Sequence, residues 1–170
     1  MPDLMPPGSS VRRRAGVQLA GILAVATGVA STIRAEFGVA PYDVVSTGMH
    51  ERLGIPIGVA AVLLPLLFVG AGLAVGGRNR VGIGTVLDVA LIGPVLGAAL
   101  YLIPEGAEPA ARVGLFAVGF ALITLGIVLV IVPELGAGPA EVLMLAISDR
   151  GHAMAPVRMG IEVASVAIGF

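Results

Sequence analysis

The chain alternates between long apolar stretches and short polar ones. A helix needs about 20 predominantly apolar residues to cross a bilayer. Five stretches approach this length, and we expect each to form a membrane span: 16–33, 56–75, 82–103, 113–132 and 154–170. The pattern therefore predicts an all-α fold, a polytopic membrane helix bundle with five spans in this sequence.

The composition agrees with this prediction. Hydrophobic residues make up 57% of the chain and charged residues 12%, whereas soluble domains average about 45–50% and about 25%. Lipid is therefore the natural covering for the apolar faces. All ten cations are arginines, scattered without aromatic residues between them, which argues against a nucleic-acid surface. The absence of cysteine excludes disulfides and thiol chemistry.

The positions of the arginines predict the orientation of the chain in the membrane. Residues 1–14 are rich in Pro, Gly and Ser and are expected to be a disordered cytoplasmic tail. The apolar run that follows lacks the small-x-small pattern of a signal-peptide cleavage site. We therefore expect it to be retained as the first membrane span. Two arginine groups should share one face of the membrane: Arg12, Arg13 and Arg14 before the first span, and Arg78 and Arg80 between the second and third. The positive-inside rule assigns that face, and the N-terminus, to the cytoplasm.

A polar ten-residue segment occurs twice, as EFGVAPYDVV at 36–45 and as ELGAGPAEVL at 134–143. The offset of 98 positions is constant, so Pro41 matches Pro139 and Asp43 matches Glu141. Matches of Gly and aliphatic residues arise easily by chance in such a composition, but the acidic, Pro and Arg matches do not. The sequence therefore predicts an internal duplication, with membrane repeats at 15–105 and 112–170.

Three spans in the first repeat would make the second repeat point the opposite way across the bilayer. Inverted repeats recur in secondary transporters, with a site at the midplane, but also in proteins that only dimerise internally. The third span of the first repeat, 82–103, would have its counterpart near about 180–201. We therefore expect a truncated second repeat, and an intact protein with six spans.

The duplicated segments predict two short helices. Pro41 and Pro139 suit a first helical turn, and Asp43 and Glu141 favour the positive N-terminal end. Each helix would have about a dozen residues, hence about 18 Å, too short to span. Two placements stay open at this point: an amphipathic helix lying flat at the interface, or a re-entrant half-helix inside the bundle.

Three polar residues lie within predicted spans. Inserting a lone carboxylate such as Asp88 into a membrane costs about 2.5–3.5 kcal/mol of free energy, unless the group is paired, protonated or exposed to water. Arg158 and Glu162 are four residues apart and can pair on one helix face. These residues are either a proton or cation site and a substrate gate, or polar contacts that hold helices together. The candidate substrate site is thus Pro41, Asp43, Pro139, Glu141, Asp88, Arg158 and Glu162.

No motif points to an enzyme, a cofactor or a metal. His50 and His152 are the only histidines and are not in an HExxH pattern. The first functional hypothesis is a small-molecule or ion transporter or permease, and the second is a non-transporting membrane scaffold or accessory subunit. The expected partners are the lipid bilayer, a small-molecule or ion substrate, and a membrane partner protein or a second copy of the chain.

Several motifs together carry a resemblance. FGVAPYDVV, GIPIGVAAVLLPL, GIGTVLDVALIGP, LGAGPAEVLMLAISDR and VRMGIEVA cover most of 16–170. The chain resembles bacterial integral membrane proteins of the YczE/YyaS/YitT type. The resemblance implies a multi-helix protein of the bacterial inner membrane with an unassigned role. Similar proteins often carry Asn at the position of Asp88, so the charge there is a departure from the pattern.

Overall fold

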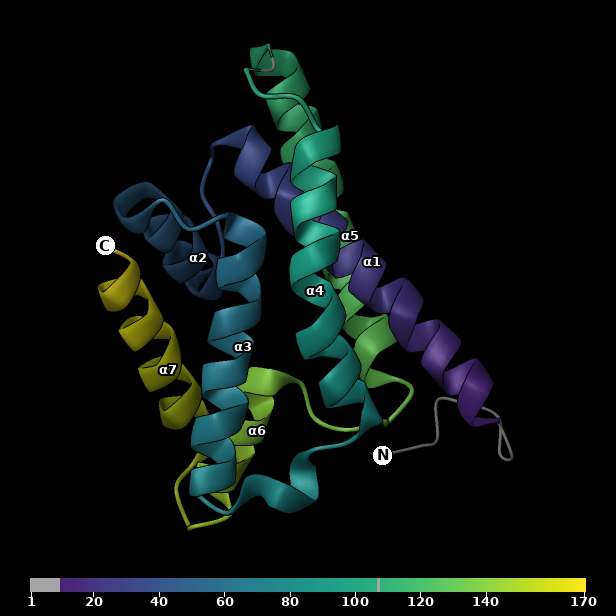
Figure 1. Ribbon diagram of the computed structural model, residues 1–170, viewed down its shortest axis with the longest axis vertical. Coiled ribbons are helices and arrows are strands. Elements are labelled where there is room, and N and C mark those ends of the chain that lie inside the picture. The colour runs from purple at the N-terminus through teal and green to yellow at the C-terminus, as the bar shows by residue number, and fades with distance from the viewer. Residues whose placement is uncertain (1–9, 107) are drawn as a thin grey trace.

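The structure is a computed structural model that describes residues 10–106 and 108–170. The described residues form seven α-helices and one short 3-10 helix, without a strand (Figure 1). In chain order these are α1 (Val11–Ala35), α2 (Pro41–Leu53), α3 (Ile57–Ala74), η1 (Gly77–Arg80), α4 (Ile83–Leu102), α5 (Pro109–Ile131), α6 (Pro139–Ser148) and α7 (Met154–Gly169). The predicted all-α class is confirmed.

Four of the five stretches predicted to cross the membrane are helices long and apolar enough to do so, namely α1, α3, α4 and α5. Helix α7 forms where the fifth span was expected, but it has 16 residues. At 1.5 Å per residue its length is about 24 Å, which is short for a crossing. The count of five spans therefore stays a prediction.

The start of α1 differs from the expectation. Arg12, Arg13 and Arg14 were expected to end a disordered tail, but they lie in the first turn of α1. The helix begins at Val11 because Ser10 caps it, with its side chain accepting a hydrogen bond from the backbone N–H of Arg13 at 3.4 Å. Residues 1–9 of the expected tail lie outside the described residues.

Helices α1 and α5 run antiparallel and pack along most of their length (Figure 1). Two glycine pairs set their separation. A Cβ atom on Gly21 would lie 2.9 Å from the carbonyl oxygen of Gly126, and one on Gly28 would lie 2.7 Å from that of Gly119. Because any side chain would collide with the facing backbone, glycine is what allows this close approach.

The other side of the bundle is built from α2, α3, α6 and α7, and α4 packs against both α1 and α3 (Figure 1). Here too the closest contacts involve glycine. Gly72 of α3 lies against Val142 of α6, and Gly48 of α2 lies against the backbone of Gly169 of α7. Helix α3 thus contacts α6, and α7 contacts α2.

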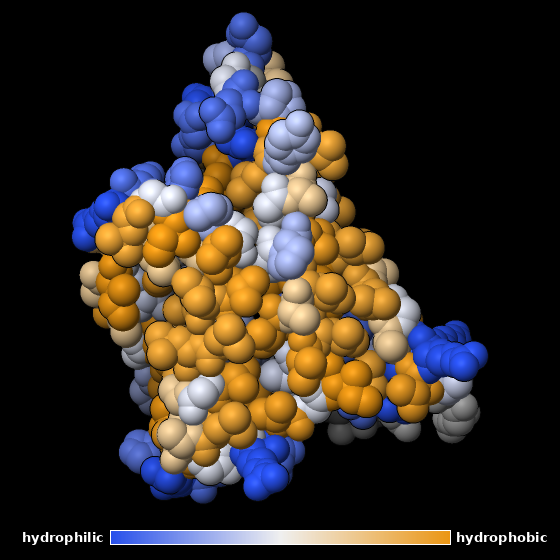
Figure 2. Space-filling view, viewed as in Figure 1, coloured by the Kyte–Doolittle hydropathy of each residue, from blue (hydrophilic) through white to orange (hydrophobic). Residues whose placement is uncertain are grey.

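Hydrophobic side chains cover the middle of the molecule, and hydrophilic ones gather at its ends (Figure 2). Large apolar residues are exposed in this belt, for example Leu67 at 64% and Phe120 at 63%. A belt of this kind suits contact with lipid chains, since a soluble protein of this size rarely exposes so large an apolar surface.

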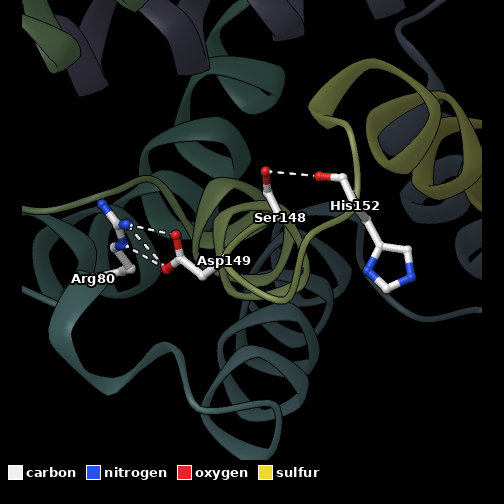
Figure 3. A network of polar contacts seen from close by, with 4 residues as sticks. All are labelled: Arg80, Ser148, Asp149 and His152. Atoms are coloured by element: carbon white, nitrogen blue, oxygen red, sulfur yellow. Dashed lines mark hydrogen bonds and ion pairs between the residues drawn. The ribbon is translucent and has the colours of Figure 1, made fainter.

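Ion pairs at the two ends tie the helices together. At the upper end of Figure 1, Arg34 pairs with Glu105, and Arg112 pairs with Glu36. At the lower end, the guanidinium of Arg80 donates to both carboxylate oxygens of Asp149, at 2.9 and 3.0 Å (Figure 3). These contacts join the end of α1 to the end of α4 and to the start of α5 at one end, and η1 to the end of α6 at the other.

Candidate functional site

The two short helices begin close to the same stretch of α3. The ring of Tyr42, in the first turn of α2, packs edge-on against Phe68, with 5.6 Å between ring centroids. Val142, in the first turn of α6, lies against Gly72, one turn further along α3. Since Phe68 and Gly72 are neighbours on α3, the N-termini of α2 and α6 lie near one another.

The C-terminal ends of these helices lie far apart. His50, near the end of α2, contacts the carbonyl oxygen of Ile55, just before the start of α3. Helix α6 ends at Ser148, beside the Asp149 carboxylate that binds Arg80 of η1, which follows the end of α3 (Figure 3). The two helices therefore begin beside the C-terminal half of α3 and diverge toward its opposite ends, as Figure 1 shows.

The first turns of α2 and α6 have the same design. Pro41 and Pro139 each occupy the start of the helix, and Asp43 and Glu141 are the acidic residues of the first turn, as predicted. Neither helix has a side-chain hydrogen bond at its N-cap, so no capping side chain satisfies its first backbone N–H groups. A carboxylate is favoured beside such an end.

The two acidic residues differ in environment. Asp43 is half-buried, and burial raises the pKa of its carboxyl to about 7. Glu141 is exposed and its carboxylate folds back over Gly138, where a Cβ atom would touch it. Among the described residues neither carboxylate forms an ion pair.

Helix α7 adds a cation and a further carboxylate. The Nε of Arg158 donates to Glu162 at 2.9 Å, which confirms the predicted pairing of these residues. Burial raises the pKa of Tyr42, and the negative charges of Glu141 and Glu162 raise it further, while Arg158 lowers it. The charges of α6 and α7 therefore reach the phenol of α2. We call Tyr42, Glu141, Arg158 and Glu162 the central cluster.

Sequence reasoning identified three members of the central cluster and missed Tyr42. A signal was present, because Tyr42 stands between Pro41 and Asp43, where the similar segment at 134–143 has Ala140. A phenol at one of two otherwise matching positions marks a difference between the two segments. Asp43 shares the first turn of α2, but no charged group of the cluster contributes to its pKa.

Asp88 lies in α4, outside the central cluster. Its carboxylate is buried, with the residue 6% exposed, and its Oδ1 accepts a hydrogen bond from Nε2 of Gln18 at 3.1 Å. Gln18 comes from α1 and was not recognised in the sequence. The charge of Glu141 acts on Asp88 as well as on Arg158. Glu141 is therefore the charged residue of the central cluster whose field reaches Asp88.

Thr85 fixes the start of α4 against the loop before α6. Its hydroxyl donates to the carbonyl oxygen of Ala137 at 2.6 Å and accepts from the backbone N–H of Gly82 at 3.1 Å. The N–H of Gly84 also donates to the carbonyl oxygen of Leu135 at 2.8 Å. These bonds join the start of α4, about one turn before Asp88, to the loop that leads into α6.

A separate polar pocket of about 360 Å³ opens near the upper end of the bundle. It lies beside the C-terminal half of α2, and its charged lining includes Arg34, Glu51 and Glu105. It is therefore distinct from the central cluster, which surrounds the N-terminal end of α2. In the part of the chain that the structure describes, no three His, Asp or Glu side chains are grouped closely enough to hold a metal ion.

Comparison with known proteins agrees with the resemblance seen in the motifs. Residues 12–170 match the family of unknown function DUF6198. The chain is 28% identical over 146 residues to the uncharacterized membrane protein YczE of Bacillus subtilis, covering 85% of this chain and 67% of the relative. It is also 28% identical over 136 residues to an uncharacterized protein of Haemophilus influenzae, covering 78% and 61%. The chain thus spans about two thirds of the length of these relatives, and no solved structure matches it.

Proposed function

We propose that this chain, which belongs to the DUF6198 family and is a YczE-type multi-pass membrane protein, is a small-molecule or ion transporter. Its substrate site is the central cluster, where the N-termini of α2 and α6 meet α7. The site lies between two inverted repeats, the first containing α1 to α4 and the second α5 to α7.

Reciprocal glycine contacts between α1 and α5 support the inverted repeats. At the offset of 98 positions Gly21 is equivalent to Gly119, and Gly28 to Gly126. In a two-fold interface, if one residue contacts a second on the partner, the second also contacts the first on the partner. Gly21 packs on Gly126 and Gly28 packs on Gly119, which is the arrangement that this rule requires.

The remaining helices follow the same rule. By the same offset α2 is equivalent to α6, and α3 to α7. Helix α3 packs on α6 while α7 packs on α2, so each contact has its counterpart. At residue level Val142 lies against Gly72, and its equivalent Val44 lies against Gly169 near the end of α7. Chance similarity of two apolar segments would not explain contacts that are reciprocal in all three pairs of equivalent helices, α1 and α5, α2 and α6, and α3 and α7.

The convergence of α2 and α6 on α3 is the observation that carries the transport proposal. Secondary transporters bind substrates at repeat interfaces, where broken helices direct their N-terminal ends toward the ligand. In this chain the two short helices begin at Phe68 and Gly72 and diverge toward opposite polar ends. This favours the re-entrant placement of α2 and α6 over the interfacial one.

The free groups of the central cluster suit a small polar substrate. The Nε of Arg158 is engaged by Glu162, but a guanidinium has four further N–H donors for an anionic group. Glu141 has no cation paired with it among the described residues, so it is available to a cationic group. The pair of opposite charges favours a zwitterion or an ion accompanied by its counter-ion.

We also infer that the N-terminus faces the cytoplasm of a bacterial inner membrane. The first turn of α1, with its three arginines, and η1, with Arg78 and Arg80, lie at the same end of the bundle (Figure 1). Arginine enrichment at one end is typical of the cytoplasmic side.

A thermal-shift screen followed by flux measurement tests this function. Wild-type protein is screened against a panel of amino acids, amines, carboxylates and inorganic ions, and each stabilising compound is then tested for uptake into proteoliposomes. We expect Glu141→Gln to lose both the shift and the uptake, and Asp149→Asn, which removes a carboxylate at the polar end, to keep both. Uptake that is equal in the two variants would exclude the central cluster as the site.

One observation favours the second function, a membrane scaffold or accessory subunit. Among the described elements α5 packs extensively on α1 alone, and its residues Val118 and Phe120 are 57% and 63% exposed. A membrane partner protein or a second copy could cover this face instead of lipid. A stoichiometric partner that copurifies in mild detergent, with no stabilising compound in the panel, would favour this function over transport.

A further inference from the structure

We propose that Asp88 and Gln18 form a proton-binding pair, in which the neutral acid of Asp88 and the amide of Gln18 make two reciprocal hydrogen bonds. A second step, which rests on the proposed transport function, makes this proton the ion that is coupled to occupancy of the central cluster.

Gln18 has a buried side-chain atom without a hydrogen-bond partner. Gln18 is 1% exposed, and its Nε2 donates to Oδ1 of Asp88 at 3.1 Å. Its Oε1 is buried and accepts no hydrogen bond from the described residues. Buried polar atoms without a partner are rare in native proteins, so this oxygen calls for a donor.

The neighbouring groups do not supply that donor. Turning the amide over would place Oε1 against the carboxylate, so the observed orientation is the favourable one for an ionised Asp88. The hydroxyl of Thr85 already donates to the carbonyl oxygen of Ala137. Gly84, one turn before Asp88, lies so close to the amide that a Cβ there would be 2.6 Å from both Nε2 and Oε1. The amide therefore lies flat on α4 beside the carboxyl group.

A proton on Asp88 completes the arrangement. The Oδ2–H of the acid donates to Oε1 of Gln18, while Nε2–H of Gln18 donates to Oδ1 of Asp88. Binding consumes one proton and changes the charge of the site from −1 to 0. Both side chains are then satisfied, and no net charge remains in α4 within the membrane.

The charged groups around Asp88 are consistent with a neutral acid. On α1, Arg14 lies one turn before Gln18, but its guanidinium donates to the carbonyl oxygen of Pro133 at 3.4 Å. Helix α3, which also packs on α4, contains no titratable residue. On α6, Glu141 places a like charge near Asp88. An ionised Asp88 would thus face a second carboxylate.

Glu141 provides the coupling. A cationic group bound at Glu141 neutralises the charge that opposes ionisation of Asp88, so its binding favours release of the proton. By linkage, protonation of Asp88 weakens binding of that cation by the same factor. The expected behaviour is exchange of a proton for a cationic substrate.

Infrared spectroscopy of the protein in lipid tests the pair without any substrate. All samples carry Asp43→Asn, because Asp43 itself titrates near neutral pH. At neutral pH we expect the carbonyl band of a protonated carboxylic acid, shifted in D₂O, absent after Asp88→Asn and kept after Asp149→Asn. Gln18→Leu should move the band to the higher frequency of an acid whose carbonyl accepts no hydrogen bond. Gln18→Met, an unbranched replacement, serves if the leucine variant does not fold.

Three results would overturn the proton-binding pair. The band could be absent at neutral pH, it could persist after Asp88→Asn, or it could stay at the same frequency in the Gln18 variants. A fourth result, loss of the band when Na⁺ is added at constant pH, would also overturn it, because the site would then bind a metal cation and not a proton. None of these results depends on a transported compound, so the pair can stand even if the transport proposal fails.

The coupling step has its own measurement. For a compound taken up by wild-type proteoliposomes, an imposed pH gradient should accelerate uptake, and Asp88→Asn should transport at a rate that no longer responds to the gradient. If uptake by the wild type does not respond to the pH gradient, the coupling step is wrong, while the proposals of transport and of the proton-binding pair still stand.

Discussion

Gly28 of α1 lies against Gly119 of α5 so closely that a Cβ on Gly28 would be 2.7 Å from the carbonyl oxygen of Gly119. The equivalent pair, Gly21 and Gly126, makes the same contact two turns away, with a distance of 2.9 Å. The two pairs form a seam in which backbone meets backbone, and neither helix can accept a side chain there without moving away from the other.

Substitutions in this seam should destabilise the protein. We expect Gly28→Ala to cost about 1–3 kcal/mol, because an extra methyl group in a packed interface forces the helices apart. Gly126→Ala, on the facing helix α5, should cost a similar amount, because a Cβ there would lie 2.8 Å from the carbonyl oxygen of Gly21. Thermal unfolding in detergent measures both. Gly16→Ala on the same helix is the control, since nothing lies within 4 Å of its Cβ position, and it should leave the melting temperature unchanged or raise it.

Stability should fall as the pH rises toward neutrality. Burial raises the pKa of Asp43 from 3.8 to about 7, so between these values the folded protein binds more protons than the unfolded chain. The free energy of unfolding then decreases with increasing pH in this window and levels off above it. Asp43→Asn cannot titrate and should flatten this part of the profile, with a higher melting temperature than the wild type above pH 7. A slope that is identical in the variant would assign the pH dependence to other groups.

Cysteine labelling should show that α2 and α6 end on opposite sides of the membrane. Arg52 and Arg150 are equivalent, exposed positions near the ends of these helices, and the chain has no native cysteine. A membrane-impermeant thiol reagent should label Arg52→Cys from outside the cell and Arg150→Cys only after the cytoplasmic face is opened. Labelling of both from one side would contradict inverted repeats.

Breaking the Arg158 and Glu162 pair should affect binding more than stability. The Arg158 side chain is 60% exposed and that of Glu162 is 34% exposed, and an i,i+4 ion pair contributes only about 0.3–0.5 kcal/mol. Glu162→Gln should therefore shift the melting temperature little, while changing the affinity for any compound that stabilises the wild type. Asp149→Asn, which breaks the pair with Arg80, is the matched control and should leave that affinity unchanged. A loss of stability in Glu162→Gln without any change in affinity would make the pair purely structural.

Much of the fold was predictable from hydropathy and helix-breaking residues. The expected stretch 82–103 corresponds to α4 within one residue at each end, because a run of about 20 apolar residues has few alternatives to a membrane helix. Pro41 and Pro139 correctly marked the starts of α2 and α6. The start of α1 was placed too late, since a helix can continue past the apolar run when charged residues extend it into water and Ser10 caps it.

The candidate site was predictable only in part. The spacing of Arg158 and Glu162 encodes their contact, because both lie on one helix. Gln18 and Asp88 are 70 positions apart, and their hydrogen bond depends on how α1 packs on α4. Nor does the sequence say that Tyr42 would lie near the charges of α6 and α7, because that requires the first turns of α2 and α6 to lie against the same part of α3. Periodicity describes single helices, whereas these contacts arise from their packing.

The glycine seam also limits how this bundle can move. Sliding α1 along α5 by one residue would bring a Cβ atom against the backbone that Gly21 or Gly28 now faces. Under the proposed transport function, alternation between inward-open and outward-open forms would keep this seam in register, while the helices around α3 and α7 turn about it. In such a mechanism α1 and α5 would be the fixed part of the molecule, and the short helices α2 and α6 would belong to the part that moves.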